Sequence, residues 1–164
     1  MLPYLDKKSK GAPDFYFAIN ATFRFIRERF GMQPLVRYWD DLGKSEYFKP
    51  VADDWTKRGR LAVAEYWRDF FAAEPDAQVD VIDTGSCVEI KVSQCPAIHH
   101  MRKHTREIVP EFCQHCYFVS QSLADRAGWE VRITGGAGSC SQSFGPKGTF
   151  APQEISSIKR VEKL

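Results

Sequence analysis

The chain has 164 residues, of which 43% are hydrophobic and 13% aromatic, and this composition is typical of one globular domain with a substantial core. The formal net charge is only +2 and the charges are mixed along the sequence, which argues against a nucleic-acid-binding protein. No apolar run approaches the roughly 20 residues of a membrane-spanning helix. We therefore expect a single domain over residues 1–164 that binds neither nucleic acid nor membranes.

The N-terminal residues 1–13 are interpreted as a polar tail. They include basic residues but no apolar segment after them, so the pattern does not fit a secretory signal. The five cysteines are an odd number, which does not suit a framework of disulfides. Together these features predict a cytoplasmic protein with reduced thiols.

The first half of the sequence predicts helices. Asp14 is a suitable N-cap for a helix whose apolar side chains recur every three or four residues until Gly31. A second helix is expected near residues 34–43, and a third over about residues 50–74. The first helix carries more aromatic side chains than one narrow stripe can bury, so we expect a homodimer or similar small oligomer. These side chains are Phe15, Phe17, Phe23, Phe25 and Phe30.

The second half predicts two β-hairpins with a pair of helices between them. After Pro75 the apolar residues alternate with polar ones, and turn residues divide the first hairpin near residues 83–86. Pro96 and Pro110 are each expected to open a helix. The second hairpin is expected over residues 129–144. Strands joined by hairpins favour an antiparallel sheet with helices on one face, which is an α+β fold.

Residues capable of chemistry are concentrated in one segment. Four of the five cysteines and all four histidines lie between Cys95 and Cys140. Cysteine and histidine side chains supply nucleophiles, proton shuttles and soft metal ligands. We therefore expect this segment to fold around one pocket.

Two histidines of this segment form a candidate pair. His100 and His104 are four residues apart, so they stack on one face of the expected helix, and Glu107 lies three residues further on. Such a pair could bind a metal ion or hold one imidazole as a general base. The alternative is a solvated polar helix face, which we favour for His99.

The next helix contains the candidate nucleophile. Cys116 lies on its expected core stripe, with Cys113 and Ser120 at the edge of that stripe, whereas His115 falls well off it. Cys116 is either a small buried hydrophobic residue or a thiolate activated for attack or for metal binding. The C-x-x-C spacing is a weak zinc signal without a second such pair. A redox motif should open a helix after a strand, whereas this one follows a helix and a proline.

The motifs of this segment resemble those of a known family. Cys95-Pro96 leads one helix, Phe112-Cys113 opens another, and the last hairpin ends in Gly138-Ser139-Cys140-Ser141-Gln142-Ser143-Phe144. From about Val79 to Phe144 the chain resembles the L-2-amino-thiazoline-4-carboxylic acid hydrolase-like family and the related vinyl-reductase-type (4VR) small-molecule-binding domains. The resemblance implies an α+β fold and hydrolysis of a cyclic amidine-like C–N bond. It departs from the family pattern at residues 115–117, where an acidic residue is expected.

These observations lead to two functional hypotheses. The first is a small-molecule hydrolase for a cyclic amidine-like or thiazoline-like substrate, and the second is a non-catalytic sensor domain that binds a small molecule or a metal. In the hydrolase, Cys116 or Cys113 is the nucleophile and His104 the base, while Cys140, Gln142 and Ser120 contact the substrate. If the mechanism uses zinc or another transition metal, the candidate ligands are Cys113, Cys116, His100, His104 and Cys140.

Overall fold

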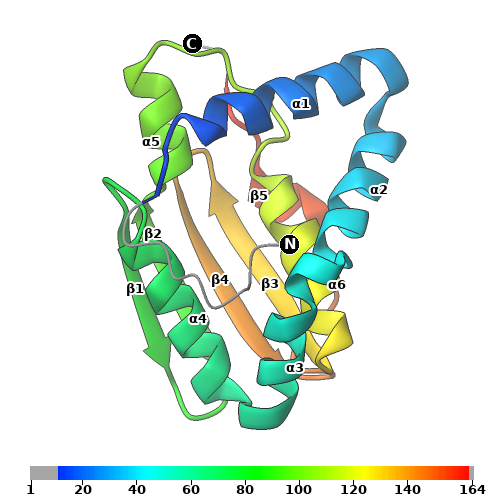
Figure 1. The fold of residues 1–164 in the computed structure, drawn as a ribbon, viewed down its shortest axis with the longest axis vertical. Helices are drawn as coiled ribbons and strands as arrows, with labels where there is room; N and C mark the ends of the chain where they lie inside the picture. The colour runs from blue at the N-terminus through cyan, green and yellow to red at the C-terminus, as the bar shows by residue number, and fades with distance from the viewer. Residues whose placement is uncertain (1–10, 163–164) are drawn as a thin grey trace.

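The computed structural model describes residues 11–162 of the chain, which form an α+β fold with the N-terminal helices first (Figure 1). The helices of the first half are α1 (Phe15–Phe30), α2 (Met32–Gly43), α3 (Lys49–Arg58) and α4 (Arg60–Ala72), with a short 3-10 helix at Glu46–Phe48. The second half contains β1 (Gln78–Asp83), β2 (Val88–Gln94), α5 (Pro96–Lys103), α6 (Gln114–Arg126), β3 (Trp129–Gly136), β4 (Ser139–Pro146), a 3-10 helix at Ile155–Ser157 and β5 (Ile158–Lys159).

The sheet has the strand order β1-β2-β4-β3-β5. Both expected hairpins are present, and β2 pairs with β4 in antiparallel orientation, which joins the two hairpins into one sheet. The expectation of a purely antiparallel sheet is wrong, because β5 adds to β3 in parallel through the pair Gly135 and Ile158. Residues on one face of the sheet, such as Lys91 and Ser141, are exposed, while their neighbours Ile90 and Gln142 are buried beneath the helices.

Three helix boundaries differ from those expected. The third expected helix is divided at Gly59, whose φ of 62° ends α3 and starts α4. The helix expected to open at Pro110 starts only at Gln114, because a turn precedes it. The helix after Pro96 ends at Lys103, and Thr105 beyond it has a φ of 49° that no helix accommodates.

The buried apolar side chains form two clusters rather than one. The first lies between α3, α4 and α6 and the inner face of the sheet, and contains Trp55 and Phe144. The second lies between α1, α2, α5 and the segment before α6, and contains Phe23 and Trp39. Cys95 and Cys113 contact both clusters. The segment that carries the cysteines therefore lies where the two clusters meet.

Close packing between α2 and α6 fixes the position of α6. A Cβ atom at Gly43 would lie 2.3 Å from the Val119 carbonyl oxygen, so only glycine allows the two helices to approach this closely. Ser122 of α6 donates a hydrogen bond of 3.0 Å to Asp40 of α2. These contacts hold the middle of α6 against α2.

The structure describes part of the predicted N-terminal tail and the aromatic side chains of α1. Residues 1–10 of the predicted polar tail lie outside the described residues, whereas Gly11 is buried and its N–H donates to the Ala73 carbonyl. On α1, Phe23 is buried, but Phe15 and Phe30 are 66% and 62% exposed. No helix within residues 11–162 is long and apolar enough to cross a membrane.

Candidate functional site

A cavity of about 450 Å³ lies at the junction of the two hydrophobic clusters. Its lining combines residues of the first cluster, such as Leu123 and Ile133, with residues of the second, such as Phe23 and Phe112. It reaches the surface beside three side chains that both line it and are 38–40% exposed, namely Tyr38, Leu42 and Phe70. Apolar and aromatic side chains dominate this lining, and none of the described residues in it is Asp, Glu, Lys or Arg.

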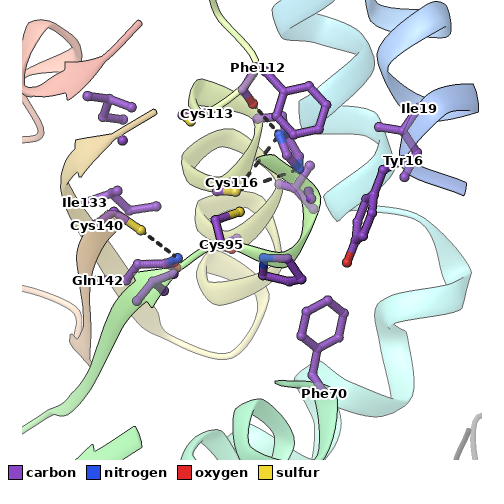
Figure 2. Close-up of a pocket in the computed structure, with 18 of the residues that line it drawn as sticks. Tyr16, Ile19, Phe70, Cys95, Phe112, Cys113, Cys116, Ile133, Cys140 and Gln142 are labelled. Atoms are coloured by element: carbon purple, nitrogen blue, oxygen red, sulfur yellow. Dashed lines mark hydrogen bonds between the residues drawn. The ribbon is translucent and has the colours of Figure 1, made fainter. Parts of the chain in front are cut away.

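The cavity has two chemically different sides. Figure 2 shows thiols from three elements on one side, and aromatic and aliphatic side chains of α1 and α4 on the other. The sulfur side consists of Cys95, Cys113, Cys116 and Cys140, and the opposite side includes Tyr16, Ile19 and Phe70. The Tyr16 hydroxyl donates a 2.5 Å hydrogen bond to Glu74, and burial together with that carboxylate raises the pKa of Tyr16.

All four thiols are protonated at neutral pH. Burial raises the pKa of Cys95 and of Cys116 from the ordinary value of 9.0 to about 11. For Cys113 and Cys140 burial, together with the nearby Cys116, raises the pKa to about 12. Removal from water disfavours a thiolate, so these side chains behave as small apolar groups with weak S–H donors.

Cys116 has an imidazole beside it. The Nε2 atom of His115 lies 3.7 Å from Cys116 Sγ, while Nδ1 donates to the Phe112 carbonyl. That hydrogen bond places the proton on Nδ1 and leaves Nε2 free to accept a proton. Burial lowers the pKa of His115, so the ring is neutral. The sequence placed His115 well off the core stripe of this helix, whereas the structure places its ring in the cavity lining beside Cys116.

The C-x-x-C pair opens helix α6, which follows α5 and a turn that contains Pro110 rather than a strand. Cys113 is the N-cap residue of α6, and Cys116 lies in its first turn. The Ala137 N–H donates to Cys113 Sγ at 3.2 Å, and the Cys95 N–H donates to the Gly138 carbonyl at 2.8 Å. The turn between β3 and β4 thus holds two of the cysteine-bearing segments in place.

Gln142 is the most deeply buried polar residue of the cavity lining, together with Ser120. Both are 5% exposed, and both line the cavity as predicted substrate contacts would. On the inner face of the sheet Gln142 lies between the buried strand neighbours Ile90 and Ile133. Its Nε2 donates a long 3.6 Å hydrogen bond to Cys140 Sγ.

The predicted base does not line the cavity. His104 is exposed at the C-cap of α5, with its ring centroid 5.6 Å from that of Phe17. Its ring lies next to that of His100, with centroids 4.6 Å apart and planes tilted by 54°. The carboxylate near this pair is not Glu107, which pairs with an arginine of α1, but Asp14, which lies 3.0 Å from His100 Nε2. The cause is the early end of α5, which removes Glu107 from the row.

The predicted metal ligands are not assembled. Within residues 11–162, no group of three or more His, Cys, Asp or Glu side chains is arranged to hold a metal ion. Cys113, Cys116 and Cys140 line the cavity, whereas His100 and His104 pack against α1. The sequence analysis did not assign a role to Cys95 or His115. The position of His115 next to Cys116 in the first turn of the helix is a signal that could have identified His115.

Comparisons with models of protein families, with curated proteins and with solved structures find no match to this chain. The resemblance to the thiazoline-carboxylate hydrolase-like family therefore stays a prediction that rests on its motifs.

Proposed function

We propose that this protein binds a neutral, apolar small molecule in the cavity between the sheet and helices α1, α4 and α6. The observation that carries the proposal is the cavity of about 450 Å³, whose described lining contains no Asp, Glu, Lys or Arg. Cavities of roughly 300–1,000 Å³ with mostly apolar walls are typical ligand sites. Each Å² of apolar ligand surface removed from water contributes about 25 cal/mol.

The charge of the ligand follows from the same lining. An ionised carboxylate would lose its water there without gaining a cationic partner, because His115 is neutral and the thiols are protonated. The carboxylic acid substrate implied by the family resemblance does not suit such a cavity. This favours the hypothesis of a non-catalytic small-molecule-binding domain over that of the hydrolase.

A hydrolase remains the second candidate because of one specific contact. His115 Nε2 lies 3.7 Å from Cys116 Sγ, and the Phe112 carbonyl orients the imidazole. In that case Sγ would attack the carbon of a C–N bond while Nε2 accepts the thiol proton and passes it to the leaving nitrogen. Water would then cleave the S–C bond. The raised pKa of Cys116 opposes this step.

Titration with naphthalene as a neutral apolar probe tests the binding proposal. We expect saturable binding by calorimetry, and its loss in Ser120→Phe, because this substitution fills the cavity that Ser120 lines. The matched control is Ser141→Phe, since Ser141 lies on the exposed face of β4. The proposal fails if wild type does not bind naphthalene, or if Ser120→Phe binds it as tightly as Ser141→Phe does.

A further inference from the structure

We propose that the cavity recognises one class of neutral ligand, an aromatic or aliphatic body that carries an amide or lactam group, through the side-chain amide of Gln142. The inference rests on the proposed binding function and adds the chemistry of the ligand's polar group. It follows from an amide that is buried in apolar surroundings without adequate partners.

The environment of Gln142 is unfavourable for an amide. The residue is 5% exposed, and its strand neighbours on both sides, Ile90 and Ile133, are 0% and 2% exposed. Within residues 11–162 its side-chain hydrogen bond is the one from Nε2 to Cys140 Sγ at 3.6 Å. Oε1 accepts no hydrogen bond from these residues and is not among their fully buried unpaired atoms, so a molecule in the cavity can reach it. An amide with one long hydrogen bond in apolar surroundings contributes little to the stability of a fold, and an aliphatic residue would pack at least as well there.

The position of Gln142 places this amide at the cavity. Gln142 lines it, and its side chain lies beside Cys140 on the sulfur side (Figure 2). The aromatic side chains of α1 and α4 lie opposite. A ligand can therefore place its apolar body against the rings while its polar end reaches the amide.

Complementarity defines the ligand group. A primary amide presents an N–H donor and a C=O acceptor side by side, so the best partner presents an acceptor and a donor with the same spacing. Lactams, whose amide is cis, and primary amides do this without carrying charge. Charged groups are disfavoured because the described lining supplies no Asp, Glu, Lys or Arg.

The test compares three probes of similar shape: 2-quinolinone, 1-methyl-2-quinolinone, which lacks the N–H donor, and naphthalene, which lacks both groups. We expect wild type to bind 2-quinolinone up to about tenfold more tightly than 1-methyl-2-quinolinone, which loses one hydrogen bond, and at least tenfold more tightly than naphthalene, which loses two, because one hydrogen bond contributes about a factor of ten or less. In Gln142→Leu the preference should disappear while naphthalene binding is retained. The matched control is Gln33→Leu, since Gln33 is exposed on α2.

A thermal melt separates recognition from a structural role. If the amide serves the ligand, Gln142→Leu should leave the Tm of the ligand-free protein unchanged or raise it, because an amide with one long hydrogen bond is replaced by an apolar group. A lower Tm would overturn the inference, as would equal affinity of wild type for the three probes. If naphthalene binds but no preference is found, this inference alone fails. If no probe binds, the proposed function fails with it.

Discussion

The reactivity of the four cavity thiols separates the binding domain from the hydrolase. A pKa of about 11 in place of 9.0 lowers the thiolate fraction at pH 8 about a hundredfold for Cys95 and Cys116. A pKa of about 12 lowers it about a thousandfold for Cys113 and Cys140. Because the thiolate is the species that reacts with alkylating agents, all four should react at least this much more slowly in the folded protein than in the unfolded chain.

The assay follows alkylation by iodoacetamide peptide by peptide, using mass spectrometry at pH 8. The control is the same protein unfolded in urea, in which the cysteines have their ordinary pKa. In the folded protein the rate should rise about tenfold for each pH unit from 8 to 10, whereas in urea it should level off above pH 9. If Cys116 reacts as fast as in urea while the other three are protected, His115 activates it, and the reasoning from burial is refuted.

Three further predictions follow from the same geometry. Replacing Cys116 with Ala should lower the free energy of unfolding by about 1 kcal/mol, as a small core truncation does, and should leave naphthalene binding intact. If Cys116→Ser instead abolishes a measurable turnover while the fold stays intact, the hydrolase is supported. The raised pKa of Cys116 means that the folded state holds this thiol proton more tightly than the unfolded state does. The resulting contribution to stability is complete below pH 9 and is lost as the pH rises through about 11. Over that range, urea titrations should show a smaller decline in the free energy of unfolding for Cys116→Ala than for wild type. If the exposed rings of α1 form a homodimer interface, light scattering at micromolar concentration should show a dimer for wild type and a monomer for Phe25→Glu. The control Tyr47→Glu should remain a dimer, because Tyr47 is equally exposed but lies away from α1. A wild-type monomer would refute this prediction.

Local sequence patterns predicted most of the fold. The alternation of apolar and polar residues over β2 and β3 identified the hairpins, because one face of each strand is buried. The two-residue strand β5 has no periodicity to detect, so the mixed character of the sheet could not be predicted. The start of α6 was misplaced because Pro110 lies in the preceding turn rather than in the first turn of the helix.

The candidate site was predicted only in part, because local patterns do not show which distant segments meet. Cys113 at the start of α6 and Cys140 on β4 line one cavity, as their predicted inward positions suggested. The assignment of His104 as base depended on a continuous helix, and α5 ends just before it. The junction of two hydrophobic clusters creates the cavity, and no local pattern reveals where two clusters meet.

The central claim is that a neutral apolar molecule occupies the cavity, and a crystal structure with naphthalene bound tests it most directly. We predict that the probe lies between the ring of Phe70 and the thiol of Cys140, which line opposite sides of the cavity. Naphthalene bound only elsewhere on the protein, or a cavity filled by ordered water in the presence of saturating naphthalene, would contradict the account.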